Sequence, residues 1–134
     1  MKTINFIILL LLVCLPQSLL AADSPAKSSQ ASAINSIAQI LIGLNHQPSK
    51  EQKQSLQQII DDQAVSGNTR NLAAVLAKIN HKPAKADKML LDMVVSDKNA
   101  TAKEQNIAKI LRNLDHQANN EEKQTLQQMV MTEE

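Results

Sequence analysis

Three histidines are the residues of this chain whose type and spacing suggest chemistry. His46, His81 and His116 follow one another at intervals of 35 residues. Neutral imidazole is the commonest side-chain ligand for zinc and copper, so a shared metal site is one interpretation. However, helices of neighbouring repeats pack about 8–10 Å apart, whereas zinc needs ligand atoms about 2.0–2.3 Å from the ion. We therefore expect the three side chains to lie too far apart for one site, and we assign no metal ligand.

The favoured interpretation places each histidine at the end of a helix. A residue just past the last helical turn often has a left-handed backbone conformation, and an imidazole there can bind free carbonyl groups. A third interpretation is a pH sensor, because three histidines would gain positive charge together in mildly acidic solution. Asp115, beside His116, is expected to point away from it and not to complete a metal site.

Two further sets of residues have side chains that bind partners in other proteins. The chain repeats a lysine at Lys53, Lys88 and Lys123; these could form a basic ladder for an acidic partner, but we favour a solvated face whose aliphatic stems cover apolar residues. Met89 and Met93 have the i, i+4 spacing that a copper site of thioether ligands would need. We interpret them as core residues, because methionine commonly fills helical cores.

Known catalytic arrangements are absent from the sequence. With only two glycines, Gly43 and Gly67, the chain has no glycine-rich phosphate loop, and it contains no H-E-x-x-H motif. No serine, histidine and aspartate set for nucleophilic catalysis can be assigned. We predict a protein that is not an enzyme and uses no cofactor.

The residues around each histidine predict helices. Apolar residues stand nine, six, five and two positions before each histidine, which is the i, i+3, i+4, i+7 stripe of an amphipathic helix. Pro48 and Pro83 then end that helix. Capping boxes that begin at Ser49 and Asn119 open a second helix, and Ala84 is a weaker start at the corresponding place in the middle copy.

This pattern predicts an all-α fold of three tandem helical hairpins, at about residues 33–63, 69–96 and 101–132. They would form a short α-solenoid or a compact helical bundle. In the middle copy, residues 89–95 are apolar almost all round, whereas the flanking copies are rich in glutamine there. A repeat between two others buries two faces. We therefore expect stacking in chain order, with a closed six-helix bundle as the alternative.

The first 22 residues are predicted to be a signal peptide. Lys2 precedes an apolar run at residues 6–15, and small residues at 19–22 offer a cleavage region. The run is too short for a convincing membrane span, and Val13 before Cys14 is a poor fit to a lipidation signal. Residues 23–32 are expected to be a disordered lead-in before a single domain at 33–134. The predicted location is the periplasm or the extracellular space.

Removal of this segment would leave a mature chain without cysteine or aromatic residues, since Cys14 and Phe6 are the only ones. Disulfides and aromatic platforms for nucleic-acid bases are then excluded. The 14 basic and 13 acidic residues balance once Lys2 is lost. We predict no nucleic-acid partner and no stable membrane insertion of the mature chain. A protein or peptide partner fits better.

Two resemblances support this expectation. The repeat length resembles that of tetratricopeptide-type helical hairpins. Residues 48–53, Pro-Ser-Lys-Glu-Gln-Lys, are similar to the Thr-x-x-Gln element of small periplasmic stress chaperones of the Spy and CpxP type. We expect an exported, non-enzymatic scaffold that binds a protein or peptide. The alternative, which the second resemblance implies, is a periplasmic stress protein that binds metal through its histidines or shields unfolded clients.

Overall fold

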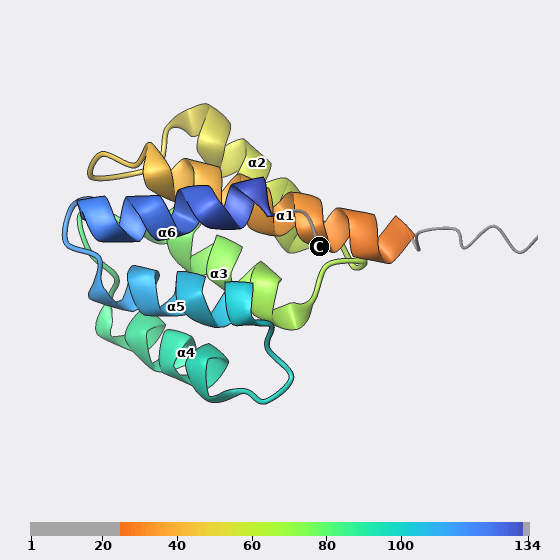
Figure 1. The fold of residues 1–134 in the computed structure, drawn as a ribbon. Coiled ribbons are helices and arrows are strands. Elements are labelled where there is room, and N and C mark those ends of the chain that lie inside the picture. Colours follow the sequence, from red (N-terminus) through yellow and green to blue (C-terminus); the bar gives the residue numbers. More distant parts are fainter. Residues whose placement is uncertain (1–24, 133–134) are drawn as a thin grey trace, which may run out of the picture.

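The structure, a computed structural model, describes residues 25–132. The expected signal peptide lies outside this range. The described residues form six α-helices, coloured along the chain in Figure 1. None of these helices has the length and apolar character that a membrane span requires. Their bounds are α1 Pro25–Ile42, α2 Lys50–Asp61, α3 Gly67–Lys78, α4 Lys85–Ser96, α5 Ala102–Asn113 and α6 Asn120–Met131.

The helix starts confirm the predicted caps. Ser49 and Asn119 form capping boxes at the starts of α2 and α6, while Ala84 caps α4 without a side-chain hydrogen bond. Ser66 caps α3 by accepting a hydrogen bond from the Thr69 amide. Side-chain oxygens at these positions satisfy amide groups that have no partner within the helix.

The six helices form an inner and an outer set. The inner helices α1, α3 and α5 contact one another, and each outer helix packs mainly against the inner helix of the next copy: α2 on α3, α4 on α5, and α6 on α1 (Figure 1). The all-α fold and the compact bundle are confirmed. The stacking in chain order is wrong, because α6 brings the third copy back to the first and closes the bundle.

The core consists of equivalent residues from the three copies. The inner helices bury the same positions of the repeat, which confirms the predicted apolar stripe. A small residue beside that stripe lets the three inner helices approach closely. Nine apolar residues of the inner helices have an exposed fraction of 0%: Ile37, Leu72, Ile107, Ala38, Ala73, Ala108, Leu41, Leu76 and Leu111.

Each outer helix buries a much narrower stripe. In α4, Leu91 and Val94 are buried, but Met89 and Met93 are 65% and 68% exposed. Our interpretation of these methionines as core residues is therefore wrong. Closure of the bundle gives the middle copy the same kind of environment as its neighbours. α4 packs mainly on α5, with a smaller contact to α3, and no further described helix covers Met89 and Met93.

The predicted disordered lead-in at 23–32 is also wrong where the structure describes it, because α1 begins at Pro25. Proline suits the first position of a helix. The added turns are held by Gln30, whose side-chain oxygen accepts a hydrogen bond of 2.8 Å from the Ser66 amide. Ala33 and Ile34, further along the same helix, are buried.

Candidate metal centre

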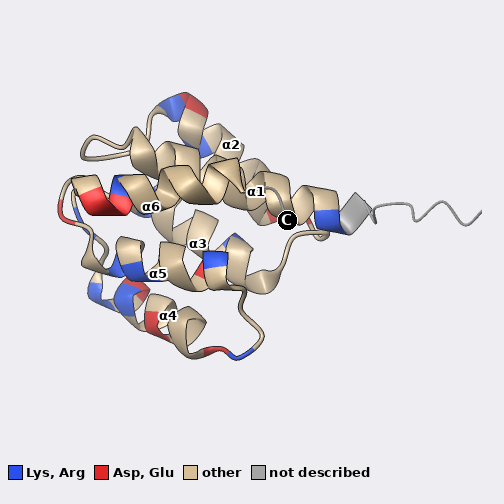
Figure 2. Ribbon diagram, in the orientation of Figure 1, with Lys and Arg blue, Asp and Glu red and all other residues tan. Residues whose placement is uncertain are grey.

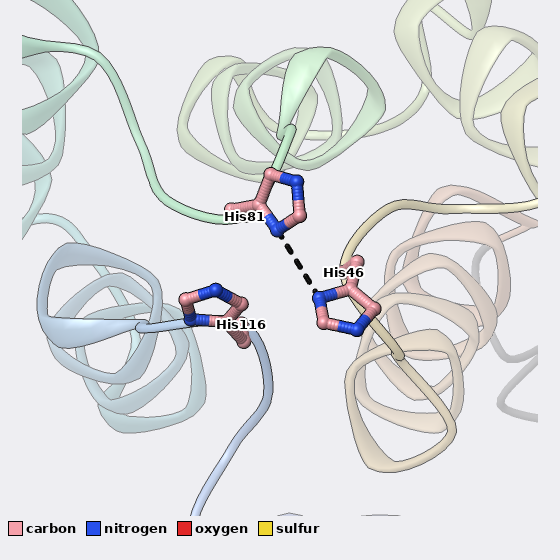
Figure 3. Close-up of side chains that lie close together, drawn as sticks. All are labelled: His46, His81 and His116. Atoms are coloured by element: carbon pink, nitrogen blue, oxygen red, sulfur yellow. Dashed lines mark hydrogen bonds between the residues drawn. The ribbon is translucent and has the colours of Figure 1, made fainter.

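The three histidines meet at one end of the bundle. Each follows the end of an inner helix, and Figure 3 shows the three imidazole rings turned toward a common centre. One ring nitrogen of each histidine lies within 4.8 Å of one from each of the others. The expectation that the histidines are too far apart is therefore wrong. They stand on turns beyond the helix ends, so the spacing between helix axes does not set their separation.

A ring of backbone hydrogen bonds fixes the three turns relative to one another. The His46 amide donates to the His116 carbonyl at 3.0 Å, the His81 amide to the His46 carbonyl at 2.8 Å, and the His116 amide to the His81 carbonyl at 2.7 Å. Every histidine thus donates once and accepts once. The ring joins all three copies and holds the three side chains on one small patch.

The histidine backbones confirm the predicted left-handed conformation. Their φ angles are 69°, 71° and 68°, and among the described residues they are the only non-glycine residues with positive φ. In the first and third copies a backbone hydrogen bond closes a tight turn across the histidine. The Gln47 amide donates to the Asn45 carbonyl at 2.9 Å, and the Gln117 amide donates to the Asp115 carbonyl at 2.8 Å. This hydrogen bond with a positive φ defines a γ-turn of the strained type.

Such a conformation costs about 1–3 kcal/mol for a residue with a Cβ atom. Glycine would adopt it with much less strain, yet all three copies place histidine there, and neither glycine has a positive φ. Strained residues persist where a side chain is needed in a fixed position. The backbone therefore favours a role for the imidazole groups themselves, beyond ending a helix.

The arrangement of the three imidazole rings is close to that expected around a bound metal ion. The ring centroids are 4.9, 5.2 and 4.9 Å apart, and Nδ1 of His46 lies 3.1 Å from Nδ1 of His81. Two imidazole nitrogens on a tetrahedral zinc ion lie about 3.3 Å apart, given Zn–N bonds of about 2.0–2.1 Å. The first two ligands are already near that spacing. All three side chains are exposed, so a small rotation could bring in the third.

Asp115 contacts the site, contrary to our expectation that it points away. Its Oδ1 atom lies 2.7 Å from Nδ1 of His116. The aspartate side chain is 77% exposed and the histidine side chain 52% exposed. A carboxylate bound to the outer nitrogen of a metal-ligating histidine is a common feature of metal sites.

The repeated lysines are not brought together. Lys53, Lys88 and Lys123 lie on the three outer helices, which do not contact one another. Figure 2 shows blue and red segments distributed over those helices. A continuous basic ladder is not formed, and the solvated face remains the better interpretation.

The opposite end of the inner helices carries a buried carboxylate. Glu104 is 1% exposed. One carboxylate oxygen accepts hydrogen bonds from the Ser66 hydroxyl, from Thr69 at 2.8 Å and from Gln30 at 3.3 Å, and the other accepts from the Thr101 amide at 2.7 Å. Burial raises the pKa of Glu104, but the hydrogen bonds from Ser66, Thr101 and Thr69 together lower it below its ordinary value.

The alignment of the copies contains a signal for this cluster. Ile34, Thr69 and Glu104 occupy equivalent positions in the repeat, and all three are buried. Equivalent positions of the three inner helices meet around the bundle axis, as they do at the histidine end. Once the bundle is known to be closed, Thr69 is the expected partner of Glu104.

No protein-family model, curated protein or solved structure matches this chain. The function proposed below is therefore supported by the geometry and chemistry of its own residues. Of these, only the histidine cluster combines several metal-binding groups within reach of one ion among the described residues.

Proposed function

We propose that this protein is an exported transition-metal-binding protein that holds Zn²⁺, or an ion of similar chemistry, with His46, His81 and His116. The observation that carries the proposal is the convergence of one ring nitrogen from each repeat within 4.8 Å. The strained backbone at the same three residues supports it. The export part of the proposal is based on the signal-like segment at residues 1–22.

The donor atoms select the class of ion. Three imidazole nitrogens suit zinc, copper and nickel, whereas calcium and magnesium prefer oxygen ligands. Three protein ligands also leave a coordination position for water or another small ligand. Because the histidines are exposed, an ion can enter and leave without a large movement of the protein. This arrangement suits reversible binding rather than a permanent structural site.

Metal binding should also stabilise the fold. The three ligands come from three copies and converge only when the bundle is closed, so the unfolded chain has no matching site. An ion that binds only the folded state stabilises it by about 2.7 kcal/mol at a free concentration one hundred times Kd. The three copies would be held together at the same end as the backbone hydrogen-bond ring.

The direct test is a zinc titration of the purified protein in competition with a chromophoric chelator. We expect one ion per chain, and no competition by His46→Ala/His81→Ala/His116→Ala. A matched control is Lys53→Ala/Lys88→Ala/Lys123→Ala, which also changes one residue per copy but leaves the site intact. Failure of the wild-type protein to compete, or undiminished binding by the histidine variant, would contradict the proposal.

A second function, the shielding of unfolded protein chains, is favoured by one surface. We propose that Met89 and Met93 bind apolar segments of other proteins. They are 65% and 68% exposed, and polar glutamine occupies the equivalent positions of both other outer helices. Exposed apolar side chains that lie together commonly mark contact sites, and methionine adapts to varied partners.

This second function has its own test. Met89→Gln/Met93→Gln copies the residues of the neighbouring helices, so it should leave the fold and the zinc affinity unchanged. We expect the wild-type protein to suppress light scattering by a chemically unfolded, unrelated protein, and the double variant to lose that suppression. Equal suppression of light scattering by both proteins would exclude Met89 and Met93 as the contact site for unfolded chains.

A further inference from the structure

The third copy differs from the others beside its histidine. The residue before the histidine is Asn45 in the first copy, Asn80 in the second and Asp115 in the third. Among the described residues, only Asp115 makes a side-chain hydrogen bond to the histidine that follows it, at 2.7 Å. The three-fold arrangement of the site is therefore broken at one ligand by a single negative charge.

This contact determines which nitrogen of His116 can bind a metal. An ionised carboxylate only accepts hydrogen bonds, so Nδ1 of His116 must carry the proton in this contact. In the neutral ring the lone pair is then on Nε2. Asp115 thus leaves Nε2 as the free donor atom of this histidine.

The other two histidines have the opposite arrangement. Nδ1 of His46 and Nδ1 of His81 face each other at 3.1 Å, close to the separation of about 3.3 Å expected for two nitrogens on one zinc ion. These atoms are in place to bind a common ion through their lone pairs. The geometry therefore indicates a site with two Nδ1 ligands and one Nε2 ligand.

We propose that Asp115 is a positioning residue of the three-histidine site. Its carboxylate orients the His116 ring, keeps the proton on Nδ1, and directs Nε2 to the ion. It also places a negative charge one residue from a bound cation. This inference depends on the metal-binding function proposed above, and it assigns the three histidines distinct roles within that site.

The carboxylate also has no evident structural role. Asp115 is 77% exposed, and its side chain makes no other hydrogen bond or ion pair within the described residues. Replacement of Asp115 should therefore leave the bundle folded. The backbone hydrogen bond that its carbonyl accepts from the Gln117 amide does not depend on the side chain.

The test compares zinc affinities and histidine tautomers in Asp115→Asn and Asp115→Ala. Removal of such an outer carboxylate typically weakens metal binding about 10–100-fold. We expect Asp115→Ala to lose affinity within this range and Asp115→Asn to lose less, because its amide oxygen can still accept the Nδ1 proton. In ¹⁵N NMR spectra of the metal-free protein, His116 should be protonated on Nδ1 in the wild type and should redistribute toward Nε2 in Asp115→Ala.

A variant that moves the carboxylate to another copy separates a positioning role of Asp115 from simple electrostatic attraction of the ion. Asn80→Asp/Asp115→Asn keeps the net charge but moves the carboxylate beside His81, whose Nδ1 is expected to bind the ion directly. We expect this variant to bind no more tightly than Asp115→Asn. Full recovery of affinity would show that only the charge matters and would overturn the positioning role, as would wild-type affinity in Asp115→Ala. Absence of zinc binding by the wild-type protein would overturn the metal site itself.

Discussion

Replacement of His81 by glycine should stabilise the metal-free protein while it greatly weakens the response to metal. His81 has a φ of 71°, a conformation that costs a residue with a Cβ atom about 1–3 kcal/mol. Glycine would remove most of that strain. The backbone hydrogen bonds at this residue, from its amide to His46 and from the His116 amide to its carbonyl, would remain.

Two unfavourable effects of the glycine substitution offset part of the stability gained by removing the strain. Glycine increases the flexibility of the unfolded chain, which costs about 0.5–1 kcal/mol. The exposed contact between the His46 and His81 rings, at 3.1 Å between Nδ1 atoms, contributes about 0.5 kcal/mol at most in water. We expect a net gain of about 1 kcal/mol, which raises the midpoint of thermal unfolding by about 4 °C for a domain of this size.

Zinc should reverse the order of stability of the two proteins, because it stabilises the wild type far more than the glycine variant. At one hundred times Kd, the ion would stabilise the wild type by about 2.7 kcal/mol, or about 10 °C. His81→Gly, with one ligand missing, should respond far less. His81→Ala is the matched control, because it removes the ligand but keeps the Cβ atom and hence the strain.

The assay is thermal unfolding followed by circular dichroism, with a chelator or with excess zinc. Without metal, the expected order of stability is glycine variant, then wild type, then alanine variant. With zinc, the wild type should be the most stable of the three. A glycine variant less stable than the wild type in the chelator would refute the strain argument, because the imidazole would then stabilise the fold by itself.

Other predictions concern the opposite end of the bundle and the helix caps. The folded state lowers the pKa of Glu104, so its contribution to stability is complete above the ordinary pKa of glutamate and is lost as pH falls through the lowered value. Glu104→Gln should cost about 2 kcal/mol at neutral pH and progressively less as pH falls below the ordinary pKa of glutamate, as urea unfolding at a series of pH values would measure; an equal cost at every pH would contradict this. Ala84 has the extended N-cap conformation without a side-chain hydrogen bond, so Ala84→Ser should stabilise the protein by about 1 kcal/mol in the same assay. No gain from Ala84→Ser would show that the start of α4 does not limit stability.

The local structure could be predicted from the sequence because it depends on nearby residues. Capping by Ser49 and Asn119 follows from side chains that reach amides three residues away. The left-handed histidines follow from a break in a helical pattern. The buried stripe that includes Leu72 and Leu76 follows from helical spacing.

Prediction of the histidine site would have required knowledge of which helices pack against each other. Local sequence patterns do not contain this information. The apolar residues of α4 suggested a middle copy with two neighbours, but the contact of α6 with α1 gives every copy equivalent neighbours. This closure brings His116 back to His46 through a backbone hydrogen bond of 3.0 Å. An estimate based on the spacing of stacked helices could not show that the three histidines converge.

The most direct measurement of the central claim is X-ray absorption at the zinc edge of the protein loaded with one equivalent of Zn²⁺. The proposed site predicts three imidazole nitrogens at about 2.0–2.1 Å, with the remaining position filled by the oxygen of a water molecule or another small ligand. His46→Ala/His81→Ala/His116→Ala should show no such imidazole signal. A first shell of oxygen atoms alone in the wild-type protein would contradict the assignment of His46, His81 and His116 as ligands.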